Sequence, residues 1–189
     1  MSHHHLNISR YNREDIEIGR MGGYVMSTLI VYAGKYGTTE KCVKTLATKI
    51  NDPVEILNLR QEAVPDLTEF DSVIVGGSIY FGQLQQACRQ FCRDHSTELM
   101  RKKLGLFICC GTFEKTEDFL DASFPADLLE HATVKAGFGG ELSLKQMSLF
   151  DRFVARMVSR AARKEGRALP AIRWDEVEQF SAAINRQVV

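Results

Sequence analysis

The residues best suited to chemistry lie in a short segment rich in glycine and threonine that follows an apolar run. The segment consists of Gly34, Lys35, Tyr36, Gly37, Thr38 and Thr39. A turn between a buried strand and a helix presents unpaired backbone N–H groups and the positive end of the helix dipole, which suits a phosphate. The threonine hydroxyls can donate to phosphate oxygens, and glycine lets the backbone approach closely. A tight strand–helix turn with Thr38 or Thr39 as N-cap explains the segment equally well.

The same segment argues against two classes of nucleotide. It lacks the Lys-Ser/Thr ending of loops that bind nucleoside triphosphates, and it lacks the Gly-x-Gly-x-x-Gly pattern of dinucleotide sites. ATP and dinucleotides are therefore poor ligands for this loop.

Two further loops combine glycines with aromatic residues at predicted strand ends. The second loop runs from Gly76 to Gly82 and includes Ser78, Ile79, Tyr80, Phe81 and Gly82; the third consists of Cys110, Gly111, Thr112 and Phe113. Aromatic side chains on such loops suit stacking against a flat ring. The alternative is that Tyr80 or Phe81 folds back onto a neighbouring helix.

Alternating strands and helices are expected to position these loops. Short apolar runs predict strands and helical spacing predicts helices. The strands are Thr28–Ala33, Val54–Leu59, Ser72–Gly77, Leu104–Cys110 and Thr133–Leu142; the helices are Thr39–Ile50, Gln83–Leu99, Thr116–His131 with an interruption near Pro125, and Arg173–Gln187 with Trp174 facing inward. This pattern predicts an α/β fold with a doubly wound, five-stranded parallel sheet in the order 2-1-3-4-5. Ligands of such sheets bind beyond the carboxyl ends of the strands, where the three loops meet.

Length and composition predict an ordinary globular protein. The 189 residues include 44% apolar and 25% charged residues. No apolar run is long enough to span a bilayer and no signal peptide is evident, so we expect a cytoplasmic protein. Its five cysteines are then expected to be reduced thiols, with a redox role for the adjacent Cys109 and Cys110 as a second interpretation.

Two segments differ in character from the rest of the chain. Residues 1–25 carry three consecutive histidines and no clear period, and Met26 precedes the first strand, so we expect a tag or mis-started extension at 1–25 and one domain at 26–189. Residues 145–167 contain seven basic and two acidic residues, a net charge of +5 on a chain whose net charge is zero. Nothing in the sequence indicates a nucleic-acid partner.

The basic segment contains an expected helix, Met147–Ala162, inserted before the final helix. Its apolar residues share one face and its arginines form a stripe beside them. One interpretation is a surface helix whose apolar face packs on the core. The other is a docking element for an acidic partner or for an anionic membrane, which attracts basic segments.

Taken together, the three loops resemble the flavin mononucleotide (FMN) site of flavodoxins. The first loop matches the phosphate pattern Ser/Thr-x-Thr-Gly-x-Thr at Gly37 and Thr39, and departs from it at Gly34 and Tyr36, where hydroxyl donors are expected. The resemblance covers about residues 27–187. It implies a flavodoxin-like fold, FMN as cofactor, Tyr80 stacked on the flavin ring and a second ring contact from Phe113.

Within this superfamily the chain is most similar to the menaquinone-dependent protoporphyrinogen dehydrogenase group. The similar segments are Gly77–Gly82, Leu149–Phe153 and Trp174–Val177, together with the extra helix before the C-terminal helix. The resemblance implies an FMN-dependent oxidoreductase that exchanges electrons with a quinone or a redox protein. The chain departs from that group after the fourth strand, where the shorter, acidic segment Thr112–Asp127 replaces a long basic loop.

Two alternatives to this function remain. A simple electron-carrier flavodoxin has no small-molecule substrate of its own, and such carriers are typically acidic near the flavin, whereas Gln83 and Gln85 follow the second loop here. A phospho-receiver module requires clustered aspartates at strand ends, and Asp71 lies at the wrong end of its strand. Fold alone does not separate these functions.

Overall fold

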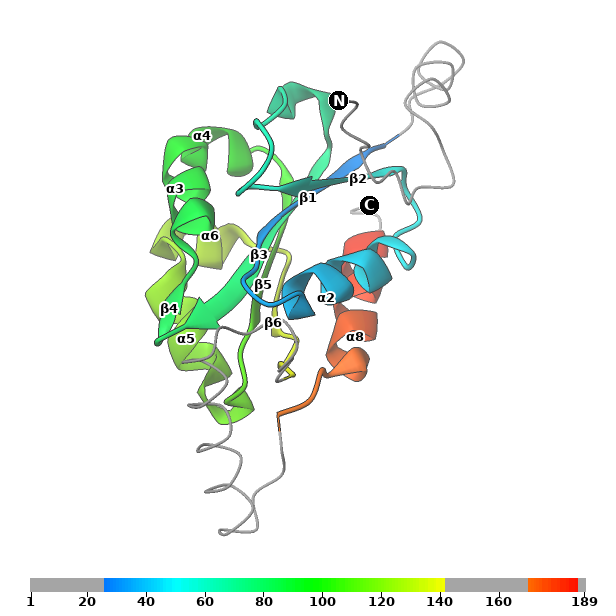
Figure 1. Ribbon diagram of the computed structural model, residues 1–189. Helices are drawn as coiled ribbons and strands as arrows, with labels where there is room; N and C mark the ends of the chain where they lie inside the picture. Colours follow the sequence, from blue (N-terminus) through cyan, green and yellow to red (C-terminus); the bar gives the residue numbers. More distant parts are fainter. Residues whose placement is uncertain (1–25, 142–169, 187–189) are drawn as a thin grey trace, which may run out of the picture.

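A five-stranded parallel sheet forms the centre of the protein (Figure 1). The structure is a computed structural model that describes residues 26–141 and 170–186. The strand order is β2-β1-β3-β5-β6, which is the predicted order of the five main strands. These strands are β1 (Thr28–Ala33), β2 (Val54–Asn58), β3 (Ser72–Tyr80), β5 (Lys103–Cys109) and β6 (Val134–Gly137).

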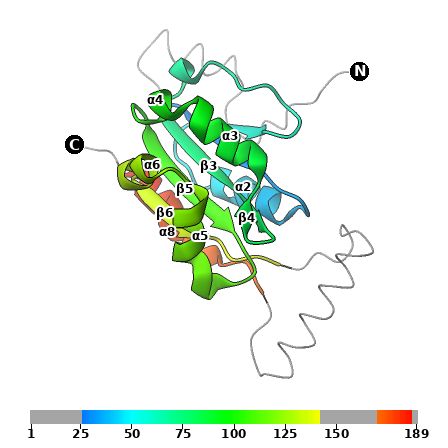
Figure 2. The same cartoon turned by 90° about the vertical axis from the view of Figure 1, so that its left-hand side faces the viewer.

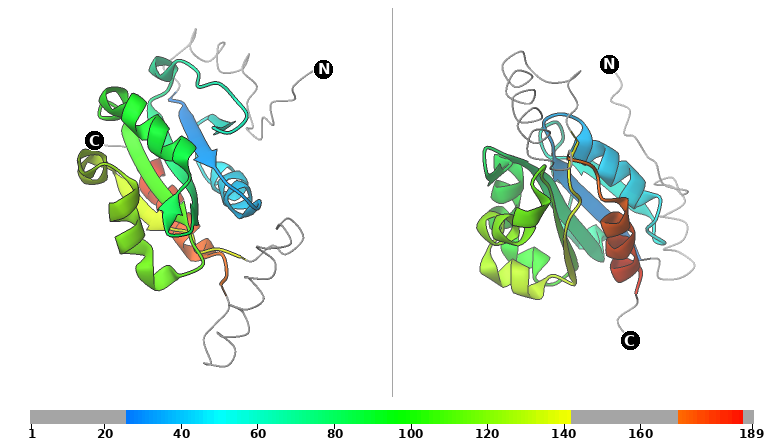
Figure 3. Two further views of the ribbon diagram at one scale, coloured as in Figure 1. Left: turned by 60° about the vertical axis from the view of Figure 1, so that its left-hand side comes forward. Right: turned by 90° about the horizontal axis from the view of Figure 1, so that it is seen from below.

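Helices cover both faces of this sheet. On one face lie α2 (Thr38–Ala47) and α8 (Trp174–Asn185); on the other lie α3 (Gln86–Asp94), α4 (Ser96–Leu99), α5 (Thr116–Ser123) and α6 (Ala126–His131) (Figure 2). Two 3-10 turns, η1 (Leu67–Glu69) and η2 (Phe113–Lys115), complete the described elements. Figure 3 shows the sheet between the two helical layers. No helix within 26–141 or 170–186 is long and apolar enough to cross a membrane.

The sequence of β1 explains why it is central. All six of its residues are buried. Because side chains alternate along a strand, Leu29 and Val31 enter the core beneath α3 and α5, while Ile30 enters the core beneath α2 and α8. A strand buried on both faces requires this continuous apolar composition.

The second loop is the largest departure from the predicted elements. The third strand continues to Tyr80 and turns back into β4 (Gln83–Leu84), which pairs antiparallel with it. The predicted helix over 83–99 was therefore wrong at its start, because Leu84 is buried opposite Ile79 in a hairpin. The remaining helix divides into α3 and α4 at His95, whose backbone leaves the helical region at φ −115°.

Two further predictions need correction, and two others are not tested. The fifth strand ends at Gly137, and the chain beyond it forms an isolated bridge between Gly139 and Ile172. Trp174 was expected to face inward but is 38% exposed; it is the first residue of α8, and its ring faces the Lys41 ammonium at 5.6 Å. The expected extension 1–25 and the expected helix Met147–Ala162 lie outside the described residues.

Gly76, which the sequence places at the end of the third predicted strand and the start of the second loop, has a packing role. It lies within β3, and a Cβ atom there would come within 2.2 Å of the Phe107 ring. Phe107 stacks on Phe138 with ring centroids 4.6 Å apart. Glycine is therefore required for a close approach within the sheet core, and not for loop flexibility.

Candidate functional site

The carboxyl ends of β1, β3 and β5 meet at one edge of the sheet and bring the three loops together. Ala33 pairs with Gly77, and Ser78 pairs with Cys109. The first loop leaves the sheet directly after Ala33, and the third begins directly after Cys109. Neighbours at this edge are therefore segments that lie more than thirty residues apart in the sequence.

The first loop ends in a helix start that no side chain caps. Gly37 is the N-cap of α2 and adopts a left-handed conformation at φ 81°, which favours glycine. Its carbonyl accepts the N–H of Lys41 at 2.9 Å, and no side-chain cap hydrogen bond forms at this helix start within 26–141 and 170–186. The interpretation of Thr38 or Thr39 as N-cap was therefore wrong, and the first backbone N–H groups of α2 are available to an anion.

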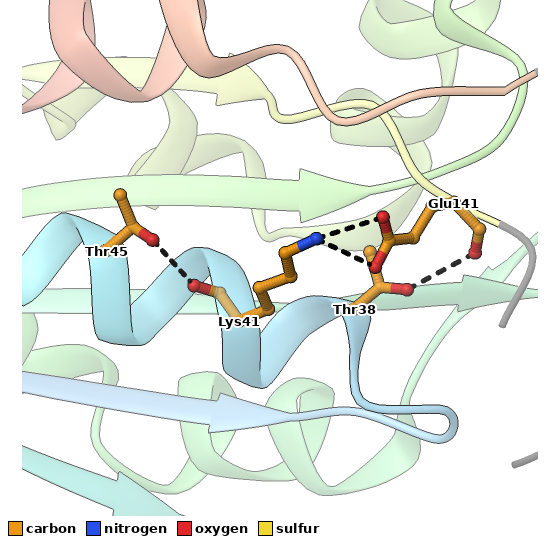
Figure 4. A network of polar contacts seen from close by, with 4 residues as sticks. All are labelled: Thr38, Lys41, Thr45 and Glu141. Carbon is orange, nitrogen blue, oxygen red and sulfur yellow. Dashed lines mark hydrogen bonds and ion pairs between the residues drawn. The ribbon is translucent and has the colours of Figure 1, made fainter.

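The two threonines of the first loop have different environments. Thr39 is 1% exposed, and its hydroxyl has no nitrogen or oxygen partner among the described residues. The Thr38 hydroxyl instead donates to the carbonyl of Glu141 at 3.3 Å (Figure 4). The Glu141 carboxylate also accepts from the Lys41 ammonium at 3.1 and 3.2 Å. The chain beyond β6 is thereby tied to the first turn of α2.

A cluster of aromatic rings and one ammonium group lies on the other side of the first loop. Tyr36 and Tyr80 meet edge to face with centroids 6.3 Å apart, and Tyr80 meets Phe81 at 4.4 Å. The Lys35 ammonium lies 3.3 Å from the centroid of Tyr80 and 5.0 Å from that of Tyr36. Positive charge is stabilised on the face of an aromatic ring. The structure thus joins the first and second loops through Lys35.

The tip of the second loop is strained. Phe81 and Gly82 form a two-residue hairpin turn in which both have positive φ, 49° and 76°. Turns of this kind favour Asn-Gly, and a bulky aromatic residue in the left-handed region costs free energy. Phe81 is nevertheless 75% exposed and contacts Tyr80, so it has not folded back onto a helix. Below the tip, the Ser78 hydroxyl is buried with no hydrogen-bond partner in the described part of the chain.

The third loop places exposed backbone and the aromatic ring of Phe113 at the site. Gly111 and Thr112 are exposed. Cys110 is buried, its thiol donates to the Thr112 carbonyl at 3.4 Å, and burial raises the pKa of that thiol. Phe113 opens η2 and lies beneath the Arg173 guanidinium at 4.2 Å. The Phe113 ring, for which a flavin contact is predicted, therefore contacts an arginine from the far end of the chain.

All five cysteines are buried thiols. The pKa of Cys109 is raised well above its ordinary value, first by a hydrogen bond with the Cys42 thiol and then by burial. Because the thiolate is the reactive form of cysteine, a raised pKa disfavours thiol chemistry. The geometry does not favour the redox interpretation of Cys109 and Cys110. No cluster within 26–141 or 170–186 has the residues to hold a metal ion.

Two cavities flank this edge of the sheet. A polar cavity of about 340 Å³ lies beside the first loop. It is lined by Tyr32, Gly34, Lys35, Gly37, Glu40, Asn58, Arg60 and Gln61. Burial, then the carboxylates of Glu40 and Glu62, raise the pKa of Tyr32 to about 12. The second cavity, of about 570 Å³, lies beside Phe113 and is acidic, with Glu114, Glu117, Asp118, Asp121 and Glu176 in its wall.

Sequence reasoning missed three residues at this edge. Arg60 follows the second strand, and the rule that ligands bind beyond the carboxyl ends of strands would have identified its position. Glu141 and Arg173 come from segments whose approach to the first and third loops depends on how the chain returns after β6. No local pattern in the sequence indicates those two contacts.

Comparisons with known proteins agree with this architecture. The Flavodoxin domain family matches residues 29–168. Over 171 residues the chain is 21% identical to protoporphyrinogen IX dehydrogenase [quinone] of Escherichia coli K12, covering 84% of this chain and 94% of that protein.

Among solved structures, a short-chain flavodoxin associated with a non-canonical PDU bacterial microcompartment aligns with a TM-score of 0.54 and 17% identity, covering 84% of this chain and 95% of that chain. Fusobacterium nucleatum flavodoxin bound to flavin mononucleotide aligns with a TM-score of 0.39 and 16% identity, covering 62% of this chain and 72% of that chain.

Proposed function

The chain belongs to the flavodoxin domain family, and on that premise we propose that it binds one FMN at the carboxyl edge of its sheet and uses it as an oxidoreductase. The observation that carries this proposal is the pairing of two unlike surfaces at one edge. The uncapped start of α2 suits a phosphate. The Tyr36 and Tyr80 rings beside it suit a flat heterocycle.

Unpartnered polar atoms at this edge fit such a ligand. The hydroxyls of Thr39 and Ser78 are buried without nitrogen or oxygen partners among the described residues, and a buried polar group that lacks a partner costs free energy. A ligand rich in oxygen atoms offers partners to both. We assign the phosphate to the loop Gly34–Thr39, and the ring to Tyr80 with Gly111, Thr112 and Phe113.

The chemistry itself belongs to the cofactor. When bound, FMN accepts and releases electrons, and the protein supplies binding, orientation and electrostatics. Lys35 places positive charge on the ring side of the site. Tyr80 and Phe81, whose rings contact each other, border that side.

We propose a quinone as the electron acceptor. The support is the likeness to a dehydrogenase named for a quinone, which spans most of both chains at 21% identity. A second candidate is an electron carrier that docks a basic redox protein, because carboxylates from α5 and α8 surround the cavity beside Phe113. Attraction between opposite charges would steer such a partner to the third loop.

The two candidates are separated by their electron acceptors. Protein loaded with FMN is supplied with protoporphyrinogen IX and a menaquinone analogue under anaerobic conditions. Oxidation faster than that by free FMN supports the dehydrogenase. No stimulation, combined with rapid transfer from the chemically reduced protein to a basic cytochrome, supports the carrier.

We also propose a cytoplasmic location with peripheral membrane contact through Met147–Ala162, a segment outside the described residues. The arginines of that segment in the sequence support the proposal, since each cation near an anionic bilayer contributes about 1 kcal/mol. The test is co-sedimentation with anionic liposomes at low and high salt, with Arg152, Arg156 and Arg160 changed to Gln. Wild-type protein that stays in the supernatant at low salt would contradict membrane contact.

A further inference from the structure

We infer that Arg60 is a positioning residue that makes the first loop selective for the phosphate of FMN over riboflavin, which lacks it. The inference rests on the proposed function, because it assigns a role within the same site. Arg60 lies two residues beyond the end of β2, on a segment distinct from the three loops predicted to hold the cofactor.

Arg60 holds the first residue of the loop. Its guanidinium donates through Nη1 to the Gly34 carbonyl at 3.0 Å. The opposite side of Gly34 packs against Thr39, since a Cβ atom at Gly34 would lie 3.0 Å from the Cβ of Thr39. The Gly34 peptide is therefore held between a cation and the first turn of α2. Loss of the Arg60 hydrogen bond would free the start of the loop.

A compact turn holds the backbone of Arg60 in place. The Asn58 side-chain carbonyl accepts the N–H of Arg60 at 3.1 Å. The backbone carbonyl of Asn58 accepts the N–H groups of Gln61 and Glu62 at 2.9 and 3.1 Å, and the Glu62 carboxylate accepts the N–H of Asn58 at 3.1 Å. Because Asn58 is the last residue of β2, the arginine extends from a point fixed to the sheet.

The charge of Arg60 is not neutralised by a carboxylate in the described part of the chain, unlike that of Lys41 or Arg173. Glu40, a carboxylate in the lining of its cavity, forms an ion pair with Lys44 at 2.5 Å. Arg60 lines the same cavity as Gly37, the N-cap of α2. An unneutralised guanidinium on the flank of a helix start adds positive charge where the phosphate is assigned.

This arrangement also accounts for the departure of the first loop from the flavodoxin pattern. The positions of Gly34 and Tyr36 lack the hydroxyl donors of that pattern. Arg60 borders the loop instead, and Lys35 within the loop lines the same cavity. Positive charge at the loop then attracts the phosphate in place of the missing hydroxyl donors.

The experiment compares FMN with riboflavin. Dissociation constants for both flavins are measured by calorimetry on the cofactor-free protein and its Arg60→Gln and Arg60→Lys variants, at two salt concentrations. Arg101→Gln is the matched control, because Arg101 is exposed on the turn after α4 and lies away from the site. Unfolding curves of each variant establish that it is folded.

We expect Arg60→Gln to weaken FMN binding about tenfold to a hundredfold and riboflavin binding less than about twofold, because the variant loses the positive charge beside the start of α2 and the charge-assisted hydrogen bond that holds Gly34. Added salt should weaken FMN binding to wild type more than to this variant. The FMN affinity of Arg60→Lys should lie between those of wild type and Arg60→Gln. If Arg60→Gln does not fold, Arg60→Lys replaces it in the test.

Two results would overturn the inference while leaving the proposed function intact: unchanged FMN affinity in Arg60→Gln, or an equal loss for both flavins. Wild-type protein that binds neither flavin would refute the proposed function, and this inference with it.

Discussion

The two ends of the candidate site are built by different means. The proposed phosphate end, Gly34–Thr39, is held by directed polar contacts, from Arg60 to Gly34 on one side and from Thr38 to Glu141 on the other. The ring end, Tyr80–Gly82, is a hairpin tip held by aromatic and cation–π contacts, with Phe81 in a strained conformation.

This difference indicates a division of labour. Hydrogen bonds fix the phosphate end before a ligand arrives, so that end is preorganised. Contacts between rings are less directional and leave the hairpin tip free to adjust to a flat ligand. Variants at the phosphate end should therefore discriminate FMN from riboflavin, whereas variants at the ring end should affect both flavins alike.

The largest expected effect breaks the ring end. Tyr80→Ala removes the ring that contacts Tyr36, Phe81 and Lys35 together. We expect it to weaken FMN and riboflavin binding by the same factor, on the order of 30-fold to 100-fold, from the loss of about 2–3 kcal/mol of stacking and burial. Calorimetric titration with both flavins measures the effect. Tyr80→Phe is the control and should retain most of the affinity, and a loss confined to FMN would contradict the division of labour.

The next effect breaks the phosphate end. Thr39→Val removes a buried hydroxyl without an oxygen or nitrogen partner while keeping the shape of the side chain. We expect FMN binding to weaken by about 1–2 kcal/mol, with riboflavin binding unchanged. The free energy of unfolding of the cofactor-free protein should change little, because the Thr39 hydroxyl has no oxygen or nitrogen partner to lose and hydrogen-bonds only with the Cys109 thiol among the described residues. Equal affinity of wild type and variant for FMN would count against this placement of the phosphate, and Thr39→Ser should behave like wild type.

A third variant sharpens the comparison by relieving the strain at the hairpin tip. Phe81→Asn places a residue that tolerates positive φ before Gly82. Denaturant unfolding of the cofactor-free protein should show a gain of about 0.5–1 kcal/mol. Flavin binding should weaken slightly for both flavins, because the exposed ring is lost. A less stable variant would show that Phe81 contributes more through its contact with Tyr80 than its backbone costs.

The smallest expected effect concerns the polar contact that Figure 4 shows. Lys41 and Glu141 form an exposed ion pair, with side chains 53% and 39% accessible. A double-mutant cycle with Lys41→Met and Glu141→Gln should give a coupling energy below about 1 kcal/mol in unfolding. Repeating the unfolding at high salt should reduce that coupling energy, because salt screens exposed charges. A coupling energy that does not change with salt would contradict the description of this ion pair as exposed to solvent.

The sequence predicted one end of the site better than the other for a physical reason. The strand–loop–helix order and the strand order follow from apolar runs and helical spacing, which are local signals, and both were confirmed for the main strands. The returning strand of the hairpin, β4, was mistaken for the start of the helix predicted from Gln83, because Leu84 fits a helical face as well as a strand face. Periodicity alone does not distinguish the two in so short a run.

Contacts between distant segments were beyond sequence reasoning. Arg60 reaches Gly34 across 26 positions, and Glu141 reaches Thr38 across 103. Neither contact leaves a repeat or a spacing in the sequence. The absence of a side-chain cap on α2 was equally hidden, since a threonine beside a glycine is an ordinary capping pattern and the backbone of Gly37 decides the outcome.

The most direct test of the central claim is a fluorescence titration of FMN with the cofactor-free protein. Stacking of the flavin against tyrosine rings at the sheet edge predicts quenching that saturates at one protein per FMN. It also predicts that Tyr80→Ala shifts the titration to a much higher protein concentration. Wild-type protein that leaves FMN fluorescence unchanged, or a Tyr80→Ala titration that overlays the wild-type curve, would contradict a flavin site at this edge.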